Sequence, residues 1–420
     1  MRIVVAGIVF SAVALAQSDV TGELALTVQE FDRPIGTRLS LKVEAGKLTG
    51  RVGSYPNRTV EGTVDGRNIT FTIRTDTAKG VVDGETMSGD VTMSGRTVKW
   101  NAVRIPPRPA QPRVHDFEPK EFPIFFSSTV KPALRIYPGD TVRTWSVDAG
   151  GVDSKGLRHS PGGNPQTGPF YIEGAMPGDT LVVKLNRVRT NRDWAESGNE
   201  VVRNALEPDQ LGNLKWDPGV PRRWKIDAKR GIAYLEKPTD KLKKFTVPLA
   251  PMLGCVATAP EEEWSIRTRD SGRFGGNMDY NQIREGTTLY LPVYHPGALL
   301  FLGDGHAAQG DGELTGDALE TSMDFEFTVD VITLGGVGKP FAENAEYLMS
   351  IGIAGSLPDA LQMATGGLMR WLNVHHGLTP SESAMVLGFA VRYDVADLVG
   401  KQVSIVAKLP KSVLAELPPK

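Results

Sequence analysis

The feature that most constrains the fold is an alternation of apolar and polar residues that recurs through the first quarter of the chain. It places one face of each strand on a core and the other in water. Turns that contain glycine or asparagine separate the stretches, which is typical of successive hairpins. The stretches are Leu24–Val28, Arg38–Val43, Lys47–Val52, Arg58–Val64, Asn68–Ile73, Lys79–Val82, Thr86–Met93 and Thr97–Val103. We therefore predict a small antiparallel β-barrel or meander over residues 17–105.

A proline-rich connector follows this unit. Residues 106–113 read PPRPAQPR, an extended segment that cannot join the interior of a sheet. The chain of 420 residues is long enough for two domains, and its 46 glycines and 29 prolines favour short strands joined by turns. We predict a second domain over residues 114–420.

This second domain is also expected to be mainly β, with a few helices near its C-terminus. Helical spacing of apolar residues predicts one helix over Leu357–Asn373, and Thr379 is the expected N-cap of another over Ser381–Phe389. Residues 191–240 form a charged, irregular excursion that either covers a site or packs as a lobe. The predicted strands are Leu134–Ile136, Thr141–Val147, Phe170–Ile172, Thr180–Leu185, Lys244–Val247, Thr287–Pro292, Phe325–Ile332 and Gln402–Ala407.

The N-terminus has the pattern of a secretory signal. Arg2 precedes the apolar run Ile3–Ala16, which ends in an A-x-A sequence and is too short to span a bilayer. We predict a signal peptide over residues 1–16, a secreted or periplasmic location, and no membrane association after cleavage. The net charge of −2 gives no basic field for nucleic acid, so we expect no nucleic-acid partner.

The chemistry is concentrated in two glycine-rich segments. Residues 275–279 read GGNMD and residues 303–313 read GDGHAAQGDGE. Each carries two ligand-type side chains at i and i+2, Asn277 with Asp279 and Asp304 with His306, which an extended backbone points to the same side. Aspartate and histidine suit a zinc-like ion, whereas carboxylate and amide oxygens suit a harder cation. Taken alone, such runs are equally consistent with solvated turns, although the apolar stretch Leu289–Phe301 before the second one favours a site.

The single cysteine offers a different nucleophile. Cys255 cannot form an internal disulfide, and it lies in the apolar run Val247–Pro260. Buried cysteines are usually unreactive, so we interpret Cys255 as a core residue.

Several motifs stand in an order that resembles the acetamidase/formamidase family. They are GPFYIEGAMPGD at residues 168–179, GGNMD at 275–279, LPVYHPGALL at 291–300 and GDGHAAQGDGE at 303–313. The tail sequences IGIAGSLPDAL and LTPSESAMVL fit as well. The resemblance covers about residues 114–415 and leaves out the N-terminal unit.

The resemblance implies hydrolysis of a short-chain amide to a carboxylate and ammonia, with a bound divalent metal ion, zinc or calcium. The small-molecule amide is the expected partner, and a homodimer is plausible. The implied metal ligands are Asp148, Asp279, Asp304 and His306. Glu173, and after it Glu313, are the candidates for the general base. Asn277 and Gln309 belong to the matched motifs and are expected to line the substrate pocket, whereas His159 and His295 are either additional pocket groups or ordinary loop residues.

Two alternatives remain open at this point. One is a hydrolase of a larger amide or a cyclic imide on the same scaffold, which export favours because formamide and acetamide can enter cells. The other is a binding protein that holds a metal ion without turnover. The identity of the amide, the identity and number of the metal ions, and the role of the N-terminal domain are left undecided.

Overall fold

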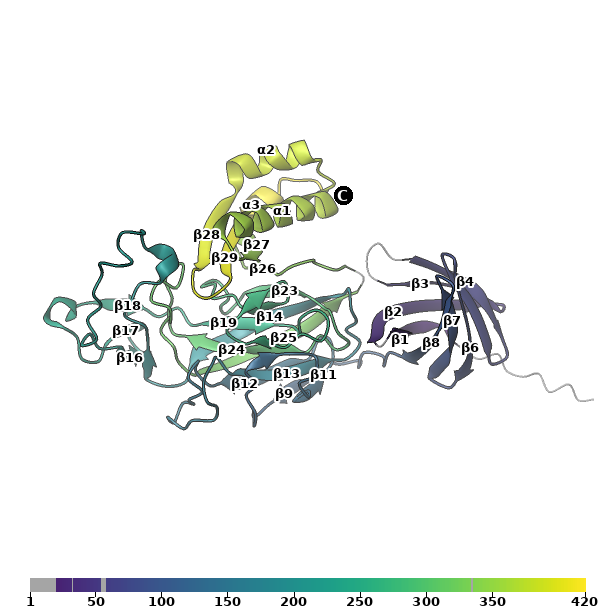
Figure 1. Cartoon of the computed structure of the whole chain (residues 1–420), viewed down its shortest axis with the longest axis horizontal. Coiled ribbons are helices and arrows are strands. Elements are labelled where there is room, and N and C mark those ends of the chain that lie inside the picture. The colour runs from purple at the N-terminus through teal and green to yellow at the C-terminus, as the bar shows by residue number, and fades with distance from the viewer. Residues whose placement is uncertain (1–19, 32, 54–57, 334) are drawn as a thin grey trace, which may run out of the picture. The chain divides into compact units, whose positions relative to one another are not determined.

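The computed structural model describes residues 20–31, 33–53, 58–333 and 335–420 (Figure 1). The chain divides into two compact units, residues 1–105 and 106–420. The predicted signal peptide, residues 1–16, lies outside the described residues. Within the described part of the chain, no helix has both the length and the apolar character that a membrane crossing requires.

The first unit is a closed antiparallel barrel in which each strand pairs with the next and β8 pairs with β1. The polar–apolar alternation explains it, because every second side chain points inward to one core. Trp100 fills part of this interior, and its indole nitrogen donates to the carbonyl oxygen of Asp90 at 3.2 Å. The strands are β1 (Gly22–Glu30), β2 (Arg33–Glu44), β3 (Lys47–Val52), β4 (Arg58–Asp65), β5 (Asn68–Ile73), β6 (Asp76–Asp83), β7 (Thr86–Met93) and β8 (Arg96–Arg104). The barrel prediction is confirmed.

Two large sheets make up the body of the second unit. The six-stranded sheet has the order β11 (Leu134–Ile136), β13 (Gln166–Ile172), β24 (Leu300–His306), β19 (Met252–Ala257), β22 (Gly275–Asn277) and β21 (Ser271–Gly272). The nine-stranded sheet has the order β28 (Arg392–Asp397), β29 (Val403–Pro410), β27 (Tyr347–Ala354), β26 (Phe341–Glu343), β23 (Thr288–Pro292), β14 (Thr180–Thr190), β25 (Met323–Ile332), β12 (Thr141–Ser146) and β9 (Val114–Asp116).

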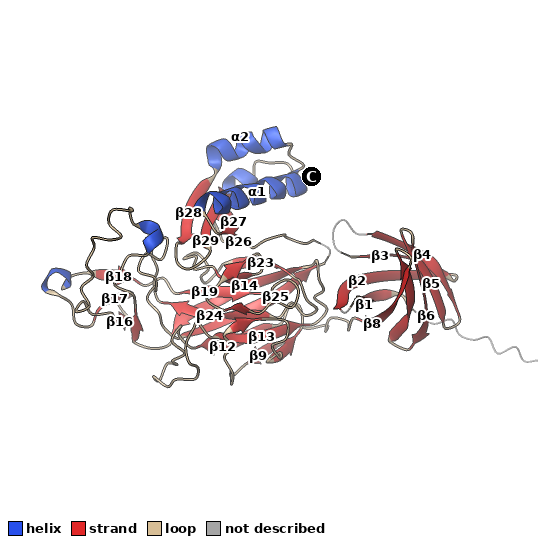
Figure 2. Cartoon of the chain, viewed as in Figure 1, coloured by secondary structure: helices blue, strands red, loops and turns tan. Residues whose placement is uncertain are grey.

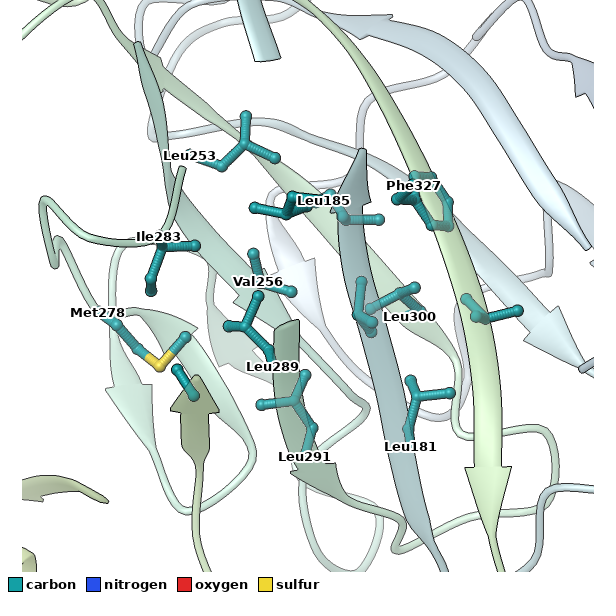
Figure 3. Close-up of a cluster of buried hydrophobic side chains, with 14 of the residues drawn as sticks. Leu181, Leu185, Leu253, Val256, Met278, Ile283, Leu289, Leu291, Leu300 and Phe327 are labelled. Carbon is teal, nitrogen blue, oxygen red and sulfur yellow. The ribbon is translucent and has the colours of Figure 1, made fainter. Parts of the chain in front are cut away.

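The apolar faces of these two sheets share one core. Figure 3 shows Val256 and Leu300 of the six-stranded sheet among Leu181, Leu289 and Phe327 of the nine-stranded sheet. All five side chains are fully buried. Sheets packed face to face in this way form a β-sandwich, and its rigid core fixes the strand ends that carry the polar motifs.

Smaller elements surround the sandwich. Residues 191–240 are both lobe and wall: they contribute to a four-stranded sheet of β15 (Trp194–Glu196), β16 (Arg223–Asp227), β17 (Ile232–Leu235) and β18 (Thr246–Pro248). The other elements are β10 (Phe125–Phe126), β20 (Ile266–Arg267), the 3-10 helices η1 (Arg203–Ala205) and η2 (Asp240–Leu242), and helices α1 (Leu357–His376), α2 (Pro380–Ala390) and α3 (Lys411–Leu414). Figure 2 shows α1 and α2 together beside β27 to β29.

Both predicted helices are present, and α1 runs to His376, beyond its predicted end at Asn373. Thr379 caps α2 in a capping box with Glu382, and Ser356 caps α1. The mainly β fold with a few C-terminal helices is therefore confirmed.

Two Pro-Gly-Asp turns fix the strands that follow them. Asp140 accepts from the Tyr137 amide at 3.1 Å, and Asp179 accepts from the Met176 amide at 2.9 Å. Each aspartate thereby closes its turn before β12 or β14 begins.

Candidate active site

Six buried polar side chains converge where β24 and β22 end, and we call them the acidic cluster. It consists of Asp279, Asp304, His306, Glu313, Glu320 and Asp397, each at most 9% exposed. Five carboxyl groups around one imidazole are unusual in a protein interior, because buried like charges repel and lose hydration.

Strand β24 carries Asp304 and His306 on one side, as the i and i+2 spacing predicts. The Nε2 atom of His306 lies 3.4 Å from Asp304 Oδ1 and 3.1 Å from Glu320 Oε1. Asp279 follows β22, where the side-chain amide of Asn277 donates to Asp279 Oδ2. The two glycine-rich motifs thus meet at one point.

Gln309 fixes the orientation of the histidine ring. Its Oε1 lies 2.9 Å from His306 Nδ1, and its amide nitrogen donates to the backbone carbonyl of Asp279. The Gln309 oxygen can only accept, so Nδ1 of His306 carries a hydrogen, and Nε2 faces the carboxylates.

The backbone around the cluster is strained. Asn164, Asp279, Asp304 and Glu313 have φ values of 64°, 40°, 60° and 48°, in the left-handed region that few residues other than glycine adopt. Such conformations persist only where the surrounding structure imposes them, and they concentrate at functional sites.

Gly254 of β19 leaves the space that the cluster occupies. A Cβ atom at this position would lie 2.3 Å from Asp279 Oδ1 and 2.5 Å from Asp304 Oδ2. Only glycine allows both carboxylates to approach the strand this closely.

Burial and mutual repulsion shift the acid–base behaviour of the cluster. Burial, together with the charges of neighbouring carboxylates, raises the pKa of Asp279 and of Glu313 well above the usual range. Burial raises the pKa of Glu320 and that of Asp397 to about 7. Burial opposes the charged imidazole, but the charges of Glu320 and Asp304 outweigh it and raise the pKa of His306 well above 6.5. The His306 charge likewise outweighs burial at Asp304 and lowers its pKa.

The cluster fits a divalent cation. Asp279, His306 and Glu313 offer ligand atoms within 4.8 Å of one another, and so do Asp304, His306 and Glu320. Among the described residues, Asp279 Oδ1, Glu320 Oε2 and His306 Nε2 are buried without a hydrogen-bond partner. Orphaned donors and acceptors of this kind need a counter-ion to offset their desolvation, and imidazole with carboxylates is a donor set for zinc-like ions.

A cleft of about 710 Å³ borders the cluster at Glu320. Asp148 and the loop at residues 149–158 line one side, and the lobe contributes Trp194, Arg222 and Arg223. Of the six cluster residues, all of them described, Glu320 alone lines this cleft. It is therefore the cluster carboxylate that a molecule in the cleft can reach.

Asn277 and Gln309 contact the cluster, whereas four of the predicted site residues lie away from it. Asp148 forms a buried ion pair with Arg192, at 2.6 Å between Oδ2 and Nη2, beside the cleft. His159 lies 2.8 Å from Asp153 Oδ2 and packs against Trp145. Asp148 lines the cleft and His159 follows Arg158 of its lining, and neither belongs to the acidic cluster.

Glu173 and His295 lie at the far end of the six-stranded sheet. β13 begins at Gln166, which pairs with Gly303 next to the cluster, and Glu173 follows the other end of β13. Glu173 therefore lies roughly 20 Å from the cluster along the strand. Both of its oxygens accept from Arg135. His295 precedes β24, with its Nε2 2.7 Å from the Pro260 carbonyl oxygen. Neither side chain reaches the acidic cluster.

Sequence reasoning missed Glu320, Asp397, Asn164 and Gly254. Glu320 follows the matched motif by seven residues without any pattern of its own, and Asp397 comes from β28 at the other end of the unit. A signal was available for Gly254 only, as a glycine inside an apolar strand, which often marks a close approach of backbone to a site.

Cys255 is the neighbour of Gly254 and is fully buried. Burial, with the charges of Asp304 and Asp279, raises the pKa of its thiol well above the usual range. The thiolate is therefore disfavoured, which agrees with its interpretation as a core residue.

Fold and site together define a β-sandwich protein with a buried acid–base centre beside an open cleft. Residues 257–348 match the acetamidase/formamidase family. The crystal structure of an acetamidase from Yersinia enterocolitica is 30% identical, with a TM-score of 0.62, and the match covers 73% of this chain and 94% of that one. An acetamidase from Bacillus halodurans is 25% identical, with a TM-score of 0.60 and coverage of 73% and 99%. The chain belongs to the acetamidase/formamidase family.

Curated relatives match over a shorter stretch. The formamidase of Methylophilus methylotrophus is 27% identical over 190 residues, which are 36% of this chain and 46% of the relative. A second relative, from Schizosaccharomyces pombe, is 25% identical over 194 residues, which are 36% of this chain and 47% of the relative. The chain spans about half the length of both. The resemblance to the family, read from the ordered motifs, is confirmed.

Proposed function

We propose that this protein is an exported amidohydrolase that cleaves the C–N bond of a carboxamide to give a carboxylate and ammonia. The observation that carries the proposal is the buried acidic cluster, which opens through Glu320 to the cleft. Family membership supports amide hydrolysis in general, and the apolar run at residues 3–16 supports export.

We assign the cluster to a divalent metal ion, zinc or calcium. His306 would hold it with Asp279 and Glu313, whose ligand atoms lie within 4.8 Å of one another, and Asp304 would join them from the same strand as His306. When bound, such an ion would activate water for attack and polarise the amide carbonyl. Gln309 keeps Nε2 of His306 free to coordinate, because it engages Nδ1.

Glu320 is the general base that transfers the proton of the attacking water to the departing nitrogen. A general base works best with a pKa near the working pH, and burial raises the pKa of Glu320 to about 7. At neutral pH its carboxylate can accept a proton from water and return it to the departing nitrogen, which must leave as an amine. Glu320 takes the role that the sequence assigned to Glu173 and Glu313, because it borders both cluster and cleft.

Metal analysis of the purified protein, combined with ammonia release from a panel of amides, tests the proposal. We expect His306→Ala to lose at least about a hundredfold in kcat/KM and most of the bound metal, because the other ligands leave an incomplete set. His295→Ala is the matched control and should retain both. Absence of ammonia from every amide, with the protein folded and metal-loaded, contradicts the enzyme assignment and favours a metal-containing binding protein.

Export has its own measurement. N-terminal sequencing of the protein recovered from outside the cytoplasm should begin near Gln17. Recovery with Met1 intact contradicts the assignment of residues 1–16 as a signal peptide.

A further inference from the structure

The cleft is much larger than a formamide molecule. Its volume of about 710 Å³ falls in the range of pockets that hold drug-sized ligands, about 300–1,000 Å³. One wall is stiff, because the Trp194 ring is stacked between the guanidinium groups of Arg192 and Arg223, 3.4 Å and 3.8 Å from the ring centre. A substrate of three heavy atoms would leave most of this space to water.

Three of the four carboxylates that line the cleft pair with arginine side chains. Asp148 pairs with Arg192, as described above, and Glu196 lies 3.2 Å from Arg223. Asp317 lies 3.5 Å from Arg222, and the fourth carboxylate is Glu320 of the acidic cluster. The arginines thus offset the charges of Asp148, Glu196 and Asp317.

Two cations of the lining have no such partner. Within the described residues, neither Lys155 nor Arg158 forms an ion pair with a carboxylate, and both are exposed on the loop that faces the lobe. Arg158 is nevertheless held in place, since its guanidinium donates to the carbonyl oxygens of Gly150 and Ser160. Hydrogen bonds to carbonyls position a guanidinium without cancelling its charge.

We propose that the cleft binds an amide that also carries a carboxylate, with the carboxylate at Lys155 and Arg158 and the amide at Glu320. The inference rests on the proposed function and names its substrate class. Water would add to the amide carbon, the C–N bond would break, and the water proton would pass to nitrogen. The products are a dicarboxylate and ammonia.

Matched pairs of amides test this inference. Succinamate and adipamate carry a carboxylate, whereas succinamide and adipamide are neutral and nearly isosteric. We expect kcat/KM to favour the acidic member of at least one pair by about tenfold, the effect of one charge-assisted hydrogen bond, mainly through KM. The preference should weaken as salt is added, because the two cations are exposed.

Variants assign the preference to its residues. In the double variant Lys155→Met/Arg158→Met, the ratio of kcat/KM for the acidic amide to kcat/KM for the neutral amide should fall to near one. In Lys155→Met alone the same ratio should fall part of the way. Because both amides are measured with the same variant, a general loss of activity affects both values equally and leaves their ratio unchanged. Lys229→Met, which removes an exposed lysine from the β16–β17 turn away from the cleft lining, is the matched control and should keep the preference.

The outcomes separate this inference from the proposed function. If formamide or acetamide is hydrolysed while neither acidic amide is preferred, or if the preference survives the double variant, the inference is overturned and the amidase assignment stands. If no amide is hydrolysed, the amidase assignment fails. Calorimetry with succinate and adipate then decides, since binding that the double variant loses supports a carboxylate site, and absence of binding overturns it.

Discussion

Four residues of the site, Asn164, Asp279, Asp304 and Glu313, hold left-handed backbone conformations. Each such conformation costs about 1–3 kcal/mol, which the rest of the unit must offset. Asparagine and aspartate tolerate this region better than most residues, and glutamate does not. The left-handed conformation of Glu313 therefore indicates that the fold holds its side chain in the site against the backbone preference of glutamate.

Gly254 is the residue whose replacement should test the close packing of the cluster. Gly254→Ala introduces a methyl group within 2.5 Å of two carboxylate oxygens, so we expect the loss of at least about tenfold in metal affinity, with the fold retained. Metal titration and circular dichroism measure the two effects. Gly310→Ala, where an added Cβ meets nothing within 4 Å, should bind metal normally. A normal metal affinity of Gly254→Ala would mean that the Asp279 and Asp304 carboxylates can shift to make room for the added methyl group.

At this scale the sequence predicts the residues that share a motif. Asp304 with His306 and Asn277 with Asp279 follow from the i and i+2 spacing, because a strand repeats every two residues. Glu320 and Asp397 do not follow from it, because their approach depends on how distant segments pack. Glu173 belongs to a family motif, but that motif builds a turn, and the side chain pairs with Arg135 instead.

At the scale of elements, the register of two strands decides which carboxylate reaches the site. β13 and β24 are antiparallel, so the end of β13 that carries Glu173 lies beside the start of β24, away from His306. Glu320 pairs in a bridge with His306 instead. Register is a long-range property that the alternation of one strand does not determine.

Two isosteric substitutions compare these carboxylates. We expect Glu320→Gln to reduce kcat by about a hundredfold or more, because an amide cannot accept the proton from water. Glu173→Gln should keep kcat within about twofold of the wild type, since it alters an ion pair with Arg135 that lies away from the acidic cluster. Initial rates at saturating amide measure both. The reverse ranking would return the general base to Glu173.

Most elements follow from local pattern. Strands with a clean alternation, such as β3 and β5, begin and end where the sequence predicts, and the capping residue Thr379 identifies the start of α2. β19 and β22 were less predictable, because glycine and a continuous apolar run carry no period. The lobe is the other exception, since charged, irregular sequence does not show which surface it covers.

At the scale of the whole molecule, a protein with a net charge of only −2 concentrates five carboxyl groups in one buried place. The global stability of the metal-free protein should therefore depend on pH through these groups. Asp397 is a suitable probe, because Asn can still accept the Val399 amide hydrogen that Asp397 accepts.

Asp397 gives this dependence a definite sign. Burial raises its pKa from 3.8 to about 7, so the native state binds more protons than the unfolded state between these values, and its contribution to stability falls as pH rises from about 4 to 7. In chelator-treated protein, Asp397→Asn should match the wild type near pH 4 and exceed it at pH 8 by at most about 4 kcal/mol. Urea unfolding at both pH values measures the difference. Asp209→Asn, on the exposed part of the lobe, is the control and should leave the stability unchanged at both pH values. Equal stability of wild type and Asp397→Asn at pH 8 would contradict the raised pKa of Asp397.

The wide spacing of the site residues along the chain has a consequence for biosynthesis. The centre draws on residues from Asn164 to Asp397, so a ribosome must translate nearly the entire second unit before the centre can close. The barrel of the first unit, whose strands pair with their neighbours in sequence, can form much earlier. The barrel can therefore fold while most of the second unit is still being made, and the acidic cluster can assemble only afterwards.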